Sequence, residues 1–566
     1  MKNIILSIVS VLALGLTGCA NLDLNPPAEA STESWYKSPE EFEMAVTDLY
    51  RGDLWYFEFF RLWNTDRWSD DFDQQAHVYD WVCGSLNGNT DFVKKTWMRS
   101  YKGITRANAV IENVEKQRGK IRESLLNKYE GEARFFRACF YSYLIFLWGD
   151  VPYYTTHITI ADAYELGRRD KWEILKDIYA DFDKAYELLP QKSTTGQSVV
   201  RATAAAFKAR TATWMNDYAV AADAAKKCID SNTYSLDSNY ERLFLMSTHD
   251  SPEFILTLPR SREFDNDDVI DISSFLPKNN GGKAIAVPSI ELFSAFLCTD
   301  GLPIDKSPLF NPAKPFENRD PRLKYTCVEY GTNFLGFEWD PSKAVVKNYK
   351  TGANVRNNDS RLNQTGASWT GQILKKGMDE DMLLDRKTDQ DCIVMRYADV
   401  LLMYAEAKIE LGQIDQGVLD AMNEVRARAY KVNKSATSRY PAITATDQAE
   451  LRFILRMERR MELSWENRRW FDIVRWRLCE KAFNRPTYGI ANKDQLQKNI
   501  KEGAWFFANG HLPVIEQDGL VDCSPLLSGS RFRVTMRRQF DPAHYLMPMH
   551  IADVTLLDKI TQNPGY

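Results

Sequence analysis

The chain has 566 residues, which is long enough for several hydrophobic cores or for one extended helical array. Lysine plus arginine total 72 and aspartate plus glutamate total 77, and the net charge of -5 comes without any long basic block, which argues against a nucleic-acid partner. Aromatic residues make up 12%, with 15 Trp and 26 Tyr, more than an ordinary core needs, so we expect some of them to be exposed for binding.

The cysteines argue against a zinc site. The nine cysteines include no Cys-x-x-Cys pair and no Cys/His cluster. The eight that follow Cys19 could pair as disulfides, but a domain of this size does not need them. We therefore predict free, buried thiols.

Residues 1–18 have the pattern of an export signal. Lys2 is followed by an apolar run over residues 4–16, too short to span a bilayer, and then by Leu16-Thr17-Gly18-Cys19. This arrangement looks like a bacterial lipobox, which predicts that Cys19 is diacylated and holds the body on a membrane. Residues 19–36 are polar, contain two prolines and are expected to form an extended tether.

The first helices are indicated by a cap and by periodicity. Ser38-Pro39-Glu40-Glu41 is a capping box with proline at the first helical position, so a helix is predicted to begin there. A second helix is predicted over residues 92–114, where apolar side chains recur every three or four positions.

The stretch between these helices is rich in Trp, Tyr, Asp and Asn and ends in an Asn87-Gly88 turn. Such residues suit sugars, because the C–H face of a pyranose stacks on an aromatic ring while its hydroxyls pair with planar amides and carboxylates. For one group of rings we favour a place in the core: Trp55, Phe57, Phe60 and Trp63. For a second group we favour exposure and ligand contact: Tyr79, Trp81, Asn87 and Asn89.

Residues 129–152, YEGEARFFRACFYSYLIFLWGDVP, carry two apolar stripes at helical period and so predict a core helix with no wet side. From Glu-Ala-Arg to Trp-Gly-Asp-Val-Pro this segment resembles the signature of the SusD/RagB family, surface glycan-binding lipoproteins of Bacteroidetes polysaccharide-uptake systems. In that family, ligand contacts often lie just before the second helix, which matches Tyr79, Trp81, Asn87 and Asn89 by place.

Further helices have the spacing of tetratricopeptide repeats. Ile178, Phe182, Ala185 and Pro190 lie at offsets of four, three and five, and two small-residue helices follow within residues 201–231. Stacked helix pairs of this kind form a scaffold and carry no chemistry of their own. Residues 37–234 are thus expected to form a first helical half.

Residues 235–392 lose the helical period, and turns and short strands are predicted there. Within this insert we select Phe275, Phe337 and Trp339 as ligand candidates, while Trp369 fits either the core or a binding platform. The acidic residues 265–268 lack the spacing of a calcium loop, so a structural calcium ion is possible but not indicated, and no cofactor is expected.

Residues 393–566 are expected to form the second helical half. The segments around Tyr397, Arg469 and the terminal Gln-Asn-Pro-Gly-Tyr resemble family phrases. Glu458, Glu462 and Glu466 follow one helix ridge and could suggest a glycosidase, but nearby arginines would hold them ionised, whereas a general acid needs a raised pKa. We favour structural ion pairs.

Together these features predict a mainly α fold, a tetratricopeptide-like superhelix of helical pairs with an irregular insert of short β-strands and loops. The resemblance implies a non-catalytic, lipid-anchored glycan-binding protein of the outer membrane, facing the cell exterior, with a SusC-like TonB-dependent transporter as partner. Three alternatives stay open: a peptide-binding member of the same family, a surface hydrolase using Glu458 and Glu462, and a pure adaptor protein.

Overall fold

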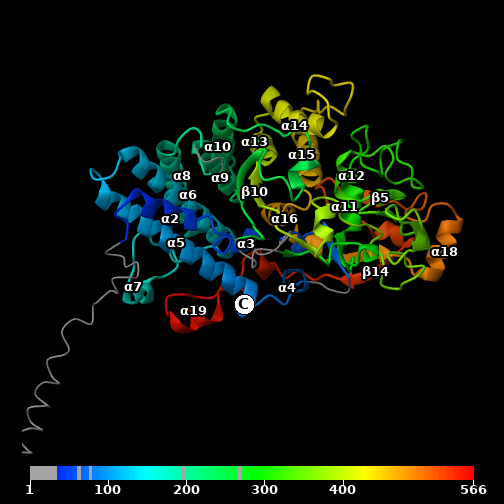
Figure 1. Ribbon diagram of the computed structural model, residues 1–566, viewed down its shortest axis with the longest axis horizontal. Helices are drawn as coiled ribbons and strands as arrows, with labels where there is room; N and C mark the ends of the chain where they lie inside the picture. The colour runs from blue at the N-terminus through cyan, green and yellow to red at the C-terminus, as the bar shows by residue number, and fades with distance from the viewer. Residues whose placement is uncertain (1–34, 60–64, 76–78, 194–197, 264–269) are drawn as a thin grey trace, which may run out of the picture.

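The computed structural model describes residues 35–59, 65–75, 79–193, 198–263 and 270–566. Helices dominate these residues, as predicted, and the short strands are scattered in small sheets (Figure 1). The lipidation candidate Cys19, the rings Phe60 and Trp63, and the acidic residues 265–268 lie outside the described residues. No helix in the described ranges is both long and apolar enough to serve as a membrane span.

The helices before residue 235 are α2 Pro39–Asp48, α3 Tyr56–Phe59, α4 Asp80–Cys83, α5 Asp91–Gln117, α6 Glu123–Trp148, α7 Ile160–Glu165, α8 Lys171–Leu188, α9 Arg201–Trp214 and α10 Tyr218–Asp230. Those after it are α11 Ile290–Ala295, α12 Arg322–Thr326, α13 Tyr397–Glu410, α14 Gln416–Ala429, α15 Gln448–Glu462, α16 Arg469–Arg475, α17 Cys479–Phe483, α18 Lys493–Lys501 and α19 Ile551–Leu556. The long helices pack in succession, α5 on α6, α6 on α8, α8 on α9, α9 on α10 and α10 on α13, which is the stacking expected of helical pairs.

Local signals set the helix boundaries. The predicted capping box is present at α2, where Ser38 Oγ accepts a hydrogen bond from the Glu41 amide at 3.4 Å and the Glu41 carboxylate accepts one from the Ser38 amide at 3.2 Å. Helix α5 covers the predicted residues 92–114.

Helix α6 is the predicted core helix with no wet side. From Tyr129 to Trp148 every residue except Arg134 is buried. Its C-terminal end is closed by the last residues of the chain, because Asn563 Nδ2 donates to the Trp148 carbonyl at 3.0 Å and the Trp148 indole N–H donates to the Pro548 carbonyl at 2.9 Å. The Trp-Gly-Asp and Gln-Asn-Pro-Gly-Tyr motifs therefore contact each other directly.

In the described part of the chain the strands form seven two-stranded antiparallel sheets, three of which lie wholly within the insert. The pairs are β1 Phe72–Gln74 with β4 Ala286–Pro288, β2 Phe254–Leu258 with β10 Cys392–Arg396, β3 Ile270–Asp271 with β9 Lys387–Thr388, β5 Thr332–Phe334 with β6 Phe337–Trp339, β7 Val345–Lys347 with β8 Asn354–Arg356, β11 Pro486–Ile490 with β14 Phe532–Arg537, and β12 Val514–Ile515 with β13 Val521–Asp522.

Two main hydrophobic cores result. The first joins the helices around α5, α6, α9 and α13, and it includes Trp55 and Phe57 as predicted. The second is formed by the insert together with residues 488–532 of the C-terminal half, and it receives Met457 and Met461 from α15. The insert and its core lie at the end of the molecule opposite α2 and α8 (Figure 1). All eight cysteines that follow Cys19 are free thiols and all but Cys83 are buried, which confirms the predicted absence of disulfides among them.

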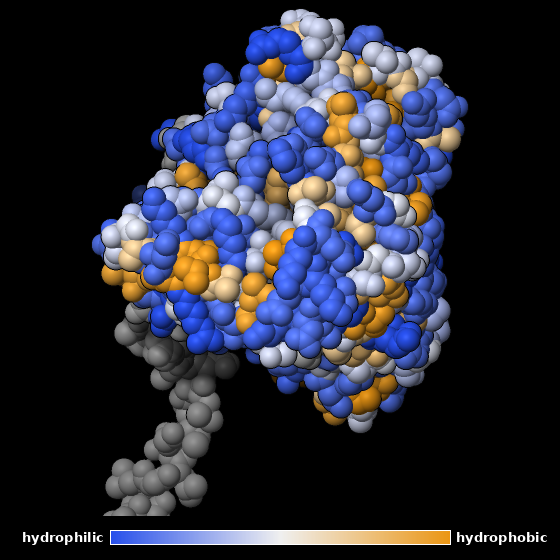
Figure 2. Space-filling model, turned by 90° about the vertical axis from the view of Figure 1, so that its right-hand side faces the viewer, coloured by the Kyte–Doolittle hydropathy of each residue, from blue (hydrophilic) through white to orange (hydrophobic). Residues whose placement is uncertain are grey.

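Seen from the insert end, the surface is mostly hydrophilic, and its apolar residues lie in separate patches (Figure 2). Scattered apolar residues of this kind are normal on a soluble body. Hydropathy alone therefore does not distinguish a binding surface on this face.

Candidate functional site

Trp81 is not a ligand platform, and its predicted exposure is wrong. Its side chain has 0% exposure, and its indole N–H donates to the His544 carbonyl at 3.0 Å. The ring lies between Trp470, Phe483 and Phe540, with centroids 4.9 to 5.4 Å away. The C-terminal segment covers the loop at this point, and nothing in the local pattern around Trp81 indicates that cover.

Phe275 and Trp339 are also core residues, contrary to the prediction. Phe275 packs on Trp465 with centroids 6.1 Å apart, and Trp339 is 3% exposed. Trp339 and Phe337 are on one strand, but Phe337 is next to the hairpin turn and half-buried, while Trp339 is at the hairpin base, inside the insert core. Trp369 likewise belongs to the interior, with the Arg533 guanidinium 4.9 Å from its ring centroid.

The carboxylates of the same loop are structural. Asp70 pairs with Arg469 at 2.8 Å and Asp71 with Arg460 at 2.6 Å, all of them buried. Burial raises the pKa of Asp73 to about 8, with the Glu291 charge as a second cause. Asp70 and Asp71 fix the loop to the C-terminal half, and Asp73 is buried, so none of the three is free to meet sugar hydroxyls.

Three of the predicted loop residues do reach solvent. Asn87 and Asn89 are exposed, and the Asn87 side chain holds its own turn by accepting from the Asn89 amide at 3.0 Å. This turn packs against the C-terminal segment, where the Ile551 amide donates to the Gly88 carbonyl at 3.3 Å. Tyr79 lies elsewhere, half-buried against Phe72 of the insert core.

Tyr79 stands at one end of a row of side-chain amides. Its hydroxyl donates to Gln74, and the Arg67 guanidinium lies 5.4 Å from its ring centroid. The next residue, Gln75, reaches Gly366, since a Cβ placed on that glycine would lie 2.7 Å from Gln75 Nε2. The amide row thus crosses from the β1 loop to the insert.

The row continues over the insert to Phe337. Gln364 Nε2 donates to Asn358 Oδ1 at 3.2 Å, and the backbone N–H of Asn358 donates to Asn279 Oδ1 at 3.0 Å. Asn280 Nδ2 then donates to the Leu335 carbonyl at 2.7 Å, in the hairpin turn that carries Phe337. We call this feature the Tyr79–Phe337 surface, with Gln74, Gln75, Gln364, Asn358, Asn279 and Asn280 between its two rings.

The members of this surface are half-buried, which fixes them without removing them from solvent. Each side-chain amide offers two donor hydrogens and a two-lone-pair oxygen, so one or two internal hydrogen bonds leave capacity for a ligand hydroxyl. Asn280 is the exception for acceptance, because its Oδ1 is buried. Of the predicted ligand residues, Tyr79 contacts Gln74 at one end of this row, and Phe337 follows the turn held by Asn280 at the other end. Asn87 and Asn89 lie on a separate turn. No local pattern predicts the amides as a group, although the Asn279-Asn280-Gly281-Gly282 turn is a usable signal of two of them.

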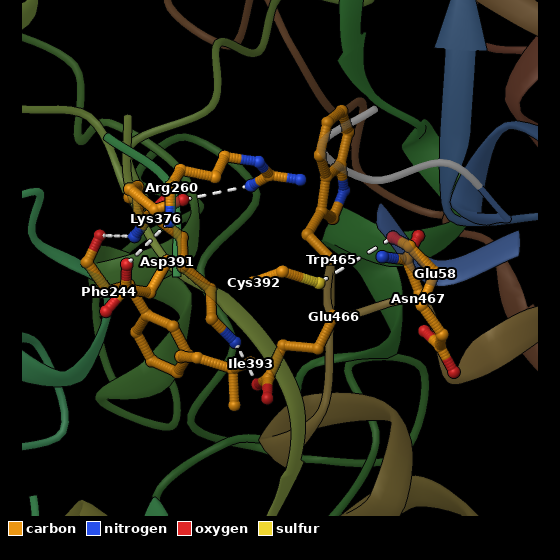
Figure 3. A pocket seen from close by; sticks show the side chains of 12 residues that line it. Glu58, Phe244, Arg260, Lys376, Asp391, Cys392, Ile393, Trp465, Glu466 and Asn467 are labelled. Atoms are coloured by element: carbon orange, nitrogen blue, oxygen red, sulfur yellow. Dashed lines mark hydrogen bonds and ion pairs between the residues drawn. The ribbon is translucent and has the colours of Figure 1, made fainter. Parts of the chain in front are cut away.

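A separate pocket, at the junction of the insert with the helices, is too small for a sugar. Its volume is about 50 Å³, against roughly 300 Å³ or more for typical ligand sites. Figure 3 shows the Lys376 ammonium directed at the Glu466 carboxylate, 2.5 Å away. Burial lowers the pKa of Lys376 to about 8, although Glu466 opposes the shift. This pocket has the size and polarity to hold a few water molecules.

The three glutamates predicted to form ion pairs do so, but only Glu458 and Glu462 are on α15; Glu466 lies beyond its end and pairs with Arg396 and Lys376. Glu458 and Glu462 have side-chain exposures of 0%, and Arg322 contacts them at 2.7 and 3.0 Å. Burial favours the neutral form of Glu462, but Arg428, Arg396 and Arg322 outweigh it and hold the pKa of Glu462 well below its usual range. These residues do not meet the needs of a general acid.

Comparison with known proteins identifies the family. The sequence model of the SusD family matches residues 229–566, more than half of the chain. The chain belongs to the SusD family. A further family model, described as starch-binding and associating with the outer membrane, matches residues 32–213 of this SusD-family protein.

Individual relatives match across the whole body. SusD-like protein P2 of Formosa agariphila is 26% identical over 539 residues, 86% of this chain and 94% of that protein. The crystal structure of a SusD-like carbohydrate-binding protein from Bacteroides fragilis has a TM-score of 0.75 and 24% identity, covering 93% of this chain and 99% of that one. A structure with xylogluco-oligosaccharide has a TM-score of 0.60 and 19% identity, covering 92% and 97% of the two chains. The structural matches establish the tetratricopeptide-like fold.

Proposed function

We propose that this SusD-family protein is a non-catalytic glycan-binding lipoprotein of the cell surface, which delivers an oligosaccharide or polysaccharide to a TonB-dependent outer-membrane transporter. The main support is the Tyr79–Phe337 surface, where two half-exposed rings bracket a row of side-chain amides. Family relatives described as carbohydrate-binding or solved with an oligosaccharide point the same way.

Binding on this surface follows from the chemistry of its parts. A sugar ring stacks its C–H face on Tyr79 or Phe337, and the amides between them exchange hydrogen bonds with its hydroxyls. Each such hydrogen bond contributes about 0.5–1.5 kcal/mol net, so affinity accumulates along several sugar residues. No bond in the ligand is broken, because the surface contains amides and rings rather than a paired acid and nucleophile.

Titration calorimetry against a panel of glycans tests the proposal. We expect Tyr79→Ala and Phe337→Ala to weaken binding of the preferred glycan about tenfold each, because each removes a stacking ring. Tyr164→Ala is the matched control, since Tyr164 is 52% exposed on α7 and shares no contact with the Tyr79–Phe337 surface. If this protein binds peptides but none of the glycans in the panel, the result would instead favour the peptide-binding alternative.

Delivery requires that the body stay near the membrane and meet the transporter. If Cys19 is acylated, the 15 residues between it and Trp35 span at most about 50 Å, so the body cannot leave the membrane surface. Four apolar side chains are exposed on α5, α7 and α19: Met98, Ile160, Tyr164 and Leu556. Met98 lines a groove of about 420 Å³, and the helices that carry the other three line it through Ala163 and Asp553. Such an apolar patch on a soluble body suits contact with a partner protein.

Co-purification from membranes tests the delivery step. Ile160→Asp together with Leu556→Asp is expected to release the protein from its transporter while leaving glycan binding intact, because both side chains are exposed. Retention of the transporter by this double variant would place the contact elsewhere on the body.

A further inference from the structure

A groove of about 660 Å³ lies outside the Tyr79–Phe337 surface and shares no residue with it. Its walls come from α6, α8, α9, α16, α17 and the C-terminal segment, and they include Lys171, Trp172, Arg475, Arg477, Glu480 and Tyr545. We call it the Trp172 groove. Its volume falls within the range of roughly 300–1,000 Å³ that is typical of ligand sites.

The groove displays a large ring to solvent from a fixed position. Trp172 is 48% exposed, the most exposed tryptophan among the described residues. Asp170 caps α8 by accepting from the Trp172 amide at 2.9 Å and the Glu173 amide at 3.1 Å, which anchors the backbone that carries the ring. An exposed indole on an anchored backbone gives a stacking face at a low entropy cost.

A second ring from the C-terminal segment lines the same groove. The Tyr545 hydroxyl donates to Glu480 and accepts from the Cys479 amide at 3.2 Å, so the ring is held by α17. The Arg477 guanidinium lies 4.1 Å from the Tyr545 ring centroid, and this cation–π contact orients it.

The groove also carries positive charge that the protein does not neutralise. Arg475 is paired with Glu406 and Asp472, so its charge is compensated. Lys171 and Arg477, by contrast, have no carboxylate within ion-pair distance in the part of the chain that the structure describes. Glu480 is the single acidic side chain of the lining, and it accepts a hydrogen bond from the Tyr545 hydroxyl. Its one negative charge is outnumbered by the positive charges of Lys171 and Arg477.

We propose that the Trp172 groove is a second saccharide site, specific for an acidic sugar such as a uronic acid or a sulfated residue. The sugar face stacks on Trp172, and its carboxylate or sulfate pairs with Lys171 and Arg477. Arginine favours such oxyanions because its planar guanidinium donates two parallel hydrogen bonds. The inference concerns a different surface from the proposed function, so either can fail without the other.

Calorimetry on the full-length lipidated protein in detergent tests the inference with two ligands of equal length, an oligogalacturonide and its methyl ester. The acid is expected to bind at least tenfold more tightly than the ester, and its affinity should fall as salt rises. Trp172→Ala and Arg477→Gln are each expected to weaken binding of the acid about tenfold.

Two controls test whether the loss of binding is specific to the Trp172 groove. Lys501→Gln removes an exposed cation on α18, far from the lining residues in sequence, and should have no effect on binding of the acid. Unchanged melting temperatures for the groove variants show that the fold is intact. Equal binding of acid and ester, equal binding of a polyglutamate peptide, or full binding by Trp172→Ala would each overturn the proposal.

Discussion

The buried centre around α15 and the Tyr79–Phe337 surface use polar residues in opposite ways. In the centre, Arg396 is 1% exposed and contacts Glu253, Glu462 and Glu466, each at 2.6 Å. On the surface, neutral amides make one or two hydrogen bonds each and remain half-buried. In these two regions, therefore, the charged groups are buried, and the uncharged amides and rings face the solvent.

This difference separates stability from binding. A buried charge has exchanged its hydration for protein partners, so loss of one partner leaves the others uncompensated. A half-buried amide has kept part of its hydration, so its loss removes a ligand contact at little cost to the fold. Variants in the two regions can test this separation, because those of the buried centre should change stability and those of the surface should change binding.

Arg396→Ala is expected to lower the free energy of unfolding by about 3–5 kcal/mol, because it leaves carboxylates buried without their counter-charge. Urea denaturation measures the loss. Arg452→Ala on α15 is the control, since Arg452 is 32% exposed, pairs with Glu410 at 2.6 Å and should cost less than about 1 kcal/mol. Equal losses for the two variants would contradict the contrast between centre and surface.

Trp81→Phe is expected to cost about 1–3 kcal/mol of stability, because it removes a buried hydrogen bond to His544 and leaves a small cavity. Glycan affinity should not change. Trp172→Phe removes an indole of the same type from an exposed site and should alter the free energy of unfolding by less than about 0.5 kcal/mol. Weakened glycan binding by Trp81→Phe would restore Trp81 as a ligand residue.

Acid should destabilise the buried centre through its glutamates. The pKa of Glu462 lies well below its unfolded value of 4.5, since its arginine partners overcome the effect of burial. A carboxylate with a lowered folded pKa stabilises the protein above the unfolded pKa, and this contribution is lost as the pH falls below about 4.5. Glu462→Gln should lower stability at neutral pH, and its free energy of unfolding should fall less steeply with acid than that of the unchanged protein. If the free energy of unfolding falls equally steeply with acid in both proteins, the pKa of Glu462 is not lowered in the folded state.

Most of the fold could be predicted because its signals are local. The capping box of α2, the period of α5 and the all-round apolar pattern of α6 each lie within one segment. The α15 ion pairs were also predicted, although the arginines that hold Glu462 come from α12, α14 and the residue before α13 rather than from α15 itself. Charge pattern on one helix indicates pairing but does not identify the partner.

The candidate site was harder to predict because exposure depends on distant segments. Trp81 is covered by His544 and Phe540, more than 450 residues later in the chain, and Asp70 is held by Arg469. Residue type favoured exposure for these side chains, and tertiary packing reversed it. Tyr79 and Phe337 were predicted and remain ligand candidates, whereas the amides between them are linked by contacts between loops that no sequence period encodes.

The smallest predicted effect tests whether the hairpin must be held in place for binding. Asn280 Nδ2 fixes the Leu335 carbonyl at 2.7 Å, next to Phe337, so Asn280→Ala should weaken glycan binding by about 0.5–1.5 kcal/mol, or roughly two- to tenfold. Asn354→Ala, at an exposed strand position of the neighbouring hairpin β7–β8, should leave the affinity unchanged. If Phe337→Ala weakens binding but Asn280→Ala does not, the ring contributes without being positioned by the amide row, and the Tyr79–Phe337 surface acts as two separate contacts rather than one.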